Sequence, residues 1–311
     1  MMSYARLSRK PLLFKSFTGL YISEFDVISR EIESRYEEHE RKRLSKRRRQ
    51  RDVGAGRPFK LKVKERFFLM LLIYYRLYIT YTLSGFLFDL DQSNICRDMS
   101  IIEPLVKRCI LLPKKLYKRT RRRLRTIDEV EEEYFPGFKA LDSSEQEIPR
   151  PENKRKRKSY YSGKKKKHTV KTQYMVNSEG TILLHKTGHD RGRIHDYEIF
   201  KNNHPMTPLQ VANLLDLGYM GVQNDFPTVK SVLTFRKKRK KGELSDEEKK
   251  HNRRHSKLMV IVEHTVSRIK KFGIMGTKFR NRLGRYDRTS DIVSGLVNFR
   301  IMMRTNRMVL L

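Results

Sequence analysis

Three acidic side chains lie beside apolar runs in a strongly basic sequence. Asp142 follows Phe-Lys-Ala-Leu, Asp216 ends a Leu-Leu run, and Glu263 lies within VIVEHTVSRIK. Three buried carboxylates would repel one another strongly unless cations lay between them. Two divalent ions, Mg²⁺ or Mn²⁺, held about 4 Å apart by carboxylates are the apparatus for in-line attack on a phosphodiester. The trio therefore predicts metal-dependent phosphodiester chemistry.

A second interpretation of these acids stays open from the residues alone. The chain has 70 Lys and Arg residues, and each acid could pair with one of them. Under the metal interpretation, Gly218 and Gly221 after Asp216 would leave room for close approach of a metal and a DNA backbone.

The overall charge points to a polyanionic partner. The 70 basic residues face 35 acidic ones, which leaves a formal charge of +35 and a pI near 10.3. Nucleic acid is favoured over an anionic membrane. The longest apolar stretch, 67–79, carries Arg76 and is shorter than a bilayer span, so it predicts a buried helix. We expect an intracellular protein, in the cytoplasm or at the nucleoid.

The two cysteines, Cys96 and Cys109, cannot build a disulfide framework or a four-cysteine zinc site. They are predicted to be core residues in a reducing environment. His251 and His255 stand four apart, but Asn252 replaces the glutamate of a zinc-protease motif, so zinc is not expected there.

Basic runs occur at 41–51, 114–125, 154–167 and 236–241. The third continues as YYSGKKKKHTVK, in which aromatic and cationic side chains adjoin a Ser-Gly turn. Such residues can stack on sugar or base and contact phosphates, which predicts a salt-dependent DNA contact. The predicted contacts are Tyr160, Tyr161, Lys164, Lys165, Lys166 and Lys167. The alternative is a solvated hairpin tip.

Helical periodicity dominates the first third of the chain. Residues 18–43 predict an amphipathic helix and 61–79 a second one, with a flexible connector at 52–60 between them. The layout from 80 to 105 is that of a helix-turn-helix. Its first helix would direct three apolar residues to the core, its turn would run from Asp89 to Asp91, and Asp91 would cap the second helix. The apolar residues are Leu83, Phe86 and Leu87.

The start of that second helix presents polar side chains suited to base edges and phosphates. They are Gln92, Ser93, Asn94 and Arg97. The alternative is a three-helix packing unit that makes no groove contact.

The hydrophobic period then changes to that of strands. Segments 138–149, 168–176 and 181–188 predict an antiparallel meander, with a hairpin turn at 177–180. A short helix is expected at 195–205 and a further strand at 209–221. One long helix is expected at 245–275. This order predicts a mixed α/β domain.

Five segments in this order resemble the DDE-superfamily transposases of insertion sequences, in the branch shared with Harbinger-type nucleases. They are DSSEQEIPRP (142–151), YYSGKKKKHTVK (160–171), HD (195–196), DLGYMG (216–221) and VEHTVSRIK (262–270). The match runs from about residue 60 to the C-terminus.

The resemblance implies a ribonuclease H-like mixed sheet flanked by helices, behind an N-terminal all-α helix-turn-helix module. It also implies that Asp142, Asp216 and Glu263 are the catalytic and metal-binding acids. Asp196 matches an accessory acid, and Lys270 matches a lysine that holds DNA near the scissile phosphate. The chain departs from relatives in two places: Ser143 and Ser144 replace Gly-Thr after the first acid, and Met259 replaces an arginine.

These observations predict three segments: an N-terminal helix and basic linker at 1–57, a helix-turn-helix module at 58–125, and a catalytic domain at 126–311. The expected function is that of a DNA transposase, an enzyme that binds terminal inverted repeats and performs cleavage and strand transfer with two Mg²⁺ or Mn²⁺ ions. Double-stranded DNA is the expected partner, and a homodimer or larger assembly the expected state. The alternative is an inactive or repurposed transposase-derived DNA-binding protein.

Overall fold

The computed structural model describes residues 1–45, 59–110, 138–178, 180, 182–203, 211–228, 230–235 and 243–304. Two compact units share the chain. The first comprises Met1–Leu111, Lys270–Gly276 and Arg288–Leu311, and the second comprises Leu112–Ile269 and Thr277–Asp287. The predicted boundaries at 57/58 and 125/126 lie outside the described residues, as do the basic runs at 114–125 and 236–241 and most of the one at 41–51. That division therefore remains a prediction.

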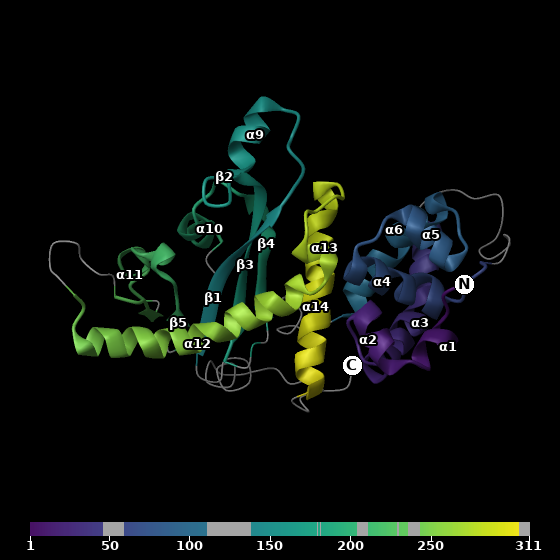
Figure 1. The fold of residues 1–311 in the computed structure, drawn as a ribbon, viewed down its shortest axis with the longest axis horizontal. Helices are drawn as coiled ribbons and strands as arrows, with labels where there is room; N and C mark the ends of the chain where they lie inside the picture. The colour runs from purple at the N-terminus through teal and green to yellow at the C-terminus, as the bar shows by residue number, and fades with distance from the viewer. Residues whose placement is uncertain are drawn as a thin grey trace. The chain divides into compact units, whose positions relative to one another are not determined.

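The first unit is helical (Figure 1). Its elements are α1 (Tyr4–Ser8), α2 (Pro11–Thr18), α3 (Ile22–Leu44), the π-helix η1 (Lys64–Leu69), α4 (Met70–Leu77), α5 (Tyr81–Phe88), α6 (Gln92–Cys109), α13 (Gly273–Gly276) and most of α14 (Tyr286–Arg304). The two predicted N-terminal helices correspond to α3 and to η1 with α4. No helix in the described part of the chain is both long and apolar enough to cross a membrane.

The core of this unit is built around aromatic rings. Phe25 stacks on Tyr4 and on Phe68, with ring centroids 5.3 and 4.8 Å apart, and meets Phe14 edge-on at 5.2 Å. Ile28 and Ile32 of α3 continue the same buried face, as their helical spacing predicted. These contacts fix α3 within the helical unit.

The turn between α5 and α6 has the predicted position but a different packing face. Asp89 adopts a left-handed conformation (φ 54°), and Asp91 caps α6 by accepting a hydrogen bond from the Ser93 amide at 2.8 Å. A Cβ at Gly85 would lie 2.4 Å from the Leu90 carbonyl oxygen, so the turn requires glycine there.

Of the three predicted core residues of α5, Leu87 is half-buried and the other two are wrong. Phe86 is 82% exposed and Leu83 45% exposed, whereas Ser84, Gly85 and Phe88 are buried. The glycine contact turns the opposite face of this short helix inward, so close backbone packing outweighs the pattern of large apolar side chains. Cys109 is buried as predicted, but Cys96 is exposed on α6.

The second unit contains a mixed sheet with the order β4–β3–β1–β5–β6. Strands β1 (Phe138–Glu147), β3 (Lys167–Asn177) and β4 (Ile182–Arg191) form the predicted antiparallel meander and run side by side in Figure 1. The short β5 (Ala212–Leu214) and β6 (Ser231–Val232) extend the sheet in parallel from β1. A two-residue strand, β2 (Tyr161–Ser162), pairs with the start of β3.

Helices complete this unit: α9 (Lys154–Tyr160), α10 (Asp196–Asn202), α11 (Val222–Asp225) and most of α12 (Asp246–Lys270). Helix α10 has the predicted place. The predicted 245–275 helix ends at Lys270, and the separate α13 follows, while the predicted strand at 209–221 shortens to β5 and is followed by a 3-10 turn at Leu217–Tyr219.

The two histidines of α12 have a structural role. His255 Nε2 lies 3.1 Å from the Val232 carbonyl and His251 Nε2 lies 2.9 Å from the Leu233 carbonyl. Asn252, between them, exchanges two hydrogen bonds with the backbone of Phe235. These contacts anchor the β6 segment to the helix, which accounts for both histidines without zinc.

Candidate active site

Asp142 and Asp216 come from neighbouring parallel strands. Ala140 of β1 is the register partner of Leu214 of β5, and each acid stands two residues further along its own chain segment. A step of two residues restores the same face of a strand, and neighbouring strands lie about 4.8 Å apart. The register therefore brings Asp142, within β1, and Asp216, just after β5, to neighbouring positions along the chain paths of these two strands.

The two acids have local backbone partners. The Ser143 amide donates to Asp142 Oδ1 at 2.7 Å, and the Leu217 amide donates to Asp216 Oδ1 at 2.7 Å. Asp142 is half-buried within β1, whereas Asp216 is exposed at the start of the 3-10 turn. Asp216 thus follows the end of β5 and caps the 3-10 turn at Leu217–Tyr219.

Glu263 and Lys270 both lie on α12, seven positions apart, and both are exposed. Within the described residues, neither Glu263 nor Asp142 nor Asp216 forms an ion pair. Among the described residues, the interpretation in which each acid pairs with a nearby Lys or Arg therefore finds no support.

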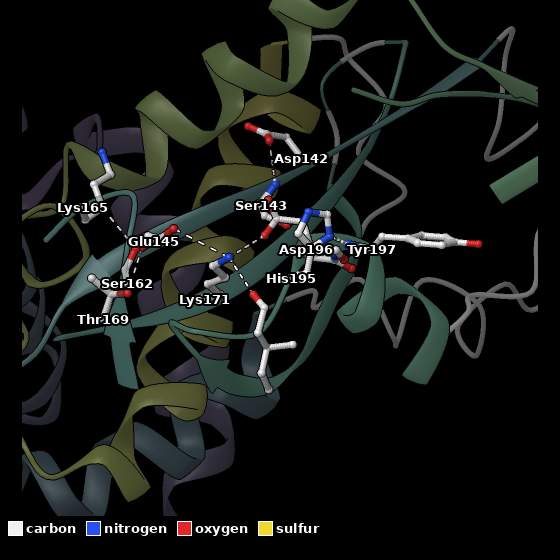
Figure 2. A network of polar contacts seen from close by, with 12 residues as sticks. Asp142, Ser143, Glu145, Ser162, Lys165, Thr169, Lys171, His195, Asp196 and Tyr197 are labelled. Carbon is white, nitrogen blue, oxygen red and sulfur yellow. Dashed lines mark hydrogen bonds and ion pairs between the residues drawn. The ribbon is translucent and has the colours of Figure 1, made fainter. Parts of the chain in front are cut away.

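Asp196 differs from these three acids because it has a cationic partner. Lys171 Nζ lies 3.0 Å from Asp196 Oδ1, donates to the Ile194 carbonyl at 2.7 Å, and lies 3.8 Å from Glu145. Lys171 is 9% exposed. Figure 2 shows its ammonium group between Glu145 and Asp196, with the Asp142 carboxylate pointing away from it.

The strand register explains this separation. Glu145 and Lys171 are partners across β1 and β3, so their side chains share one face of the sheet. Asp142 is three residues from Glu145, so it projects from the opposite face. Asp196 is thereby held on the Lys171 face.

The electrostatics of the site centre on Asp142. Burial raises the pKa of the Asp142 carboxyl, and the negative charges of Asp196, Asp216 and Glu263 raise it further, against the hydrogen bond from Ser143, which lowers it. The charges of the other three acids therefore act on Asp142 through space. A carboxylate in such surroundings favours a proton or a metal cation beside it.

The donor set suits a hard divalent cation, because Mg²⁺ and Mn²⁺ prefer carboxylate oxygens and three carboxylates here lack a cationic partner among the described residues. As the side chains stand in the described part of the chain, no three His, Cys, Asp or Glu residues are close enough to hold one ion together. Metal binding would require these side chains to turn toward one another.

A buried tyrosine links the two acid-bearing segments, and sequence reasoning missed it. The Tyr219 hydroxyl lies 3.1 Å from Ser143 Oγ and accepts a hydrogen bond from Gln173 Nε2 at 3.1 Å. Gln173 also donates to the Asp196 carbonyl at 2.6 Å. Burial raises the pKa of Tyr219, so its hydroxyl stays protonated.

The sequence carried little signal for this network. Polar residues run without a break through both segments, as Lys171-Thr172-Gln173 and Ser143-Ser144-Glu145. In the structure they form cross-strand pairs, Ser143 with Gln173 and Glu145 with Lys171. Because such a run does not alternate, it predicts neither which face of the sheet is polar nor which residue of another segment covers it.

The structure explains why residue 221 is a glycine, but it gives no such reason at residue 218. Gly221 has φ +102°, a conformation that favours glycine. A Cβ at Gly218 would meet nothing within 4 Å, so packing among the described residues does not demand glycine there. The expectation that Gly218 leaves room for DNA stays a prediction.

The residues predicted to contact DNA through the helix-turn-helix are exposed at the start of α6. Gln92 Oε1 accepts a hydrogen bond from the Thr82 hydroxyl at 3.0 Å, and Ser93 is bonded to Asp91. Arg97 Nη1 donates to Asn94 Oδ1 at 3.2 Å, which leaves most of its guanidinium donors at the surface.

The other predicted contact segment forms a tight turn. Lys164, Lys165 and Lys166 are exposed after β2, whereas Lys167 forms an ion pair with Glu147 at 2.6 Å. Tyr161 is 41% exposed, and Tyr160 is half-buried. Thus three of the four lysines present unpaired charge among the described residues.

The fold defines the class. An antiparallel β4–β3–β1 set extended by parallel β5 and β6, with helices beside it, is a ribonuclease H-like fold. The comparisons give the family. Residues 141–298 match the family described as DDE superfamily endonuclease, and residues 59–111 match the helix-turn-helix of DDE superfamily endonuclease. The chain belongs to the DDE superfamily endonucleases.

A curated relative is similar over most of both chains. It is named as the probable transposase for insertion sequence element IS702 of Microchaete diplosiphon, and it is 29% identical over 249 residues, which cover 80% of this chain and 84% of the relative. No solved structure gives a significant match.

Proposed function

We propose that this chain is a DNA transposase that binds the terminal inverted repeats of a mobile element and catalyses metal-dependent cleavage and strand transfer. The single observation that carries the proposal is the trio Asp142, Asp216 and Glu263. Their carboxylates lack cationic partners among the described residues, and the charges of Asp216 and Glu263 raise the pKa of Asp142. Family membership and the similarity to a probable insertion-sequence transposase support it.

The proposed roles follow from the side chains. Asp142 and Asp216 would bridge or flank two Mg²⁺ or Mn²⁺ ions, and Glu263 would complete the second site. When bound, the ions activate water and stabilise the departing oxygen of the phosphodiester. Lys270 would hold DNA close to the acids, and Asp196, paired with Lys171, would act as an accessory acid that fixes the Ile194–Asp196 segment.

DNA recognition is assigned to the helical segment 58–125, through Gln92, Ser93, Asn94 and Arg97, and catalysis to 126–311. We propose double-stranded DNA as the partner, at the element ends and at the target. A homodimer or larger assembly follows from the need to process two element ends together. Two nucleophiles, water and then the freed 3′-hydroxyl, would act without a covalent protein intermediate.

Strand cleavage of element-end DNA with Mg²⁺ or Mn²⁺ tests the catalytic assignment. Asp142→Ala and Glu263→Ala should each lose cleavage while keeping DNA binding. The matched control is Asp225→Asn, an exposed carboxylate of the same unit that pairs with Tyr197 and Lys201, and it should cut like the parent. If both alanine variants cut as well as the parent, the assignment is wrong. A parent that binds end DNA but never cuts it supports the alternative of an inactive or repurposed DNA-binding protein.

A further inference from the structure

The second unit contains a basic cavity. It has a volume of about 610 Å³, and its charged lining comes from α9 and from the segment between β4 and α10. The cationic side chains are Arg155, Lys158, Arg191 and Arg193. Glu198 is the one carboxylate in the lining, so the cavity carries a net charge of +3.

These cations are available to a ligand. All four are exposed, and none of them forms an ion pair within the part of the chain that the structure describes. Clustering unpaired like charges is unfavourable without a counter-charge. The arrangement therefore favours an anion in the cavity.

The cavity is held together by backbone contacts. The Arg193 amide donates to the Ser159 carbonyl at 3.3 Å, and the Gly192 amide donates to the Thr169 carbonyl at 2.9 Å. A Cβ at Gly192 would lie 2.1 Å from Thr169 Oγ1 and 2.8 Å from the Tyr160 carbonyl oxygen, so this close approach requires glycine. Glycine at 192 thus lets the loop bring Arg191 and Arg193 next to α9.

The same loop leads to the accessory acid Asp196. Ile194 lines the cavity, and its carbonyl accepts the hydrogen bond from Lys171 that accompanies the Lys171–Asp196 ion pair. The loop that carries Arg191 and Arg193 is therefore fixed at its far end by a buried lysine.

The lining decides which part of a nucleic acid fits. Pockets that hold a flipped or unpaired base use aromatic stacking, and among the described residues that line this cavity none is aromatic. Arginine and lysine are the side chains that bind phosphate oxygens. Resting on the proposed function, we infer that this cavity binds the sugar-phosphate backbone of the substrate DNA.

The salt dependence of DNA binding tests this inference. Binding of a fluorescent duplex of arbitrary sequence is measured with the full chain, in EDTA so that no cleavage occurs, over a series of salt concentrations. Arg155→Gln/Lys158→Gln removes two cavity charges from α9. The slope of log affinity against log salt should flatten by roughly 0.9 for each DNA phosphate that the variant no longer neutralises.

The matched control removes two charges from the same helix without touching the cavity. Lys154→Gln/Lys156→Gln should keep the parent slope, and Arg191→Gln/Arg193→Gln should behave like the first pair. Circular dichroism melting confirms that each variant is folded. Equal slopes for the cavity pairs and the control pair would overturn the inference.

A competition arm separates DNA from free phosphate as the ligand. At constant ionic strength, inorganic phosphate should displace the duplex no better than chloride does. Displacement from the parent but not from Arg155→Gln/Lys158→Gln would assign the cavity to small phosphate ligands instead. A parent that shows the expected slopes but never cuts DNA would refute the proposed function and leave the cavity assignment standing.

Discussion

The Asp142 carboxylate lies in surroundings that oppose its charge. Burial and three neighbouring carboxylates raise its pKa, so the folded protein holds this proton more tightly than the unfolded chain does. The resulting destabilisation is absent below the ordinary aspartate pKa of about 3.9, develops as the pH rises from there through the raised pKa, and is complete above it.

Asp142→Asn should therefore melt above the parent at pH 7 in EDTA, by roughly 2–4 °C for each kcal/mol relieved, because asparagine still accepts the Ser143 hydrogen bond. The two proteins should converge near pH 3. Added Mg²⁺ should raise the melting temperature of the parent more than that of the variant. Differential scanning calorimetry across pH measures all three effects.

The control for this prediction is Asp225, a carboxyl group whose pKa is shifted in the opposite direction. The hydrogen bond from Tyr197 lowers the pKa of the exposed Asp225 carboxyl. Asp225→Asn should therefore gain nothing at pH 7. An Asp142→Asn protein that melts below the parent at pH 7 without metal would contradict the electrostatic account.

Tyr219 offers a second test at a single residue. Tyr219→Phe keeps the buried ring but removes the hydroxyl that meets Ser143 and Gln173. We expect a loss of about 1 kcal/mol or more in the free energy of unfolding, because buried polar partners are left unsatisfied. Urea unfolding measures it, and Tyr197→Phe, whose hydroxyl reaches only the exposed Asp225, serves as the milder comparison.

At the scale of elements, local signals predicted much of the fold. The meander β1–β3–β4, helix α10, the α5–α6 turn and the Asp91 cap follow from alternation, turn residues and capping chemistry. Helix α9 and strand β6 were missed, since a basic run and a two-residue strand carry little periodicity. The inward face of α5 was wrong because the Gly85–Leu90 contact, rather than hydrophobic pattern, orients that helix.

For the candidate site too, the sequence indicated individual residues but not the contacts between distant segments. Asp142 and Asp216 were visible as acids beside apolar runs, and the pairing of β1 with β5 then places one within a strand and the other just after the neighbouring strand. The pairing of Asp196 with Lys171, and the contact of Tyr219 with Ser143, join segments 25 and 76 residues apart. Contacts at that range depend on how strands pair, which no local pattern specifies.

Helix α6 is the proposed DNA-recognition helix, and its role can be tested at Arg97. Arg97→Ala should weaken binding to the terminal inverted repeat by about 1–3 kcal/mol, because an exposed guanidinium at the start of this helix is suited to a base edge or a phosphate. Electrophoretic mobility shift on repeat and scrambled DNA separates the two roles. Arg30→Ala, an exposed arginine on α3, is the comparison, and unchanged binding by Arg97→Ala would move recognition away from α6.

At the scale of the whole molecule, charge and chain path have separate consequences. A formal charge of +35 attracts any nucleic acid, so it supplies affinity without sequence information. The chain path determines which segments fold together. Residues 270–276 and 288–311 belong to the helical unit, although they follow the second unit in sequence.

The C-terminal segments make specific contacts within that helical unit. Arg76 of α4 packs over the Phe272 ring at 5.6 Å and donates to the Lys271 carbonyl. In α14, Asp291 pairs with Lys107 at 2.5 Å, and Arg300 pairs with Glu24 at 3.2 Å. The helical unit is therefore assembled from both ends of the chain.

A fragment of residues 1–112 should therefore lack a cooperative unfolding transition at the temperature where the intact chain shows one. It loses Ile292, Val293 and Leu296, which are fully buried, and burial of each such side chain stabilises by about 1.5–3 kcal/mol, against a typical total of about 5–15 kcal/mol. Calorimetry and near-ultraviolet circular dichroism measure the loss. Adding a peptide of residues 286–304 should restore part of the transition, whereas a scrambled peptide should not, and a fragment that unfolds cooperatively at the parent temperature would show that the N-terminal helices are self-sufficient.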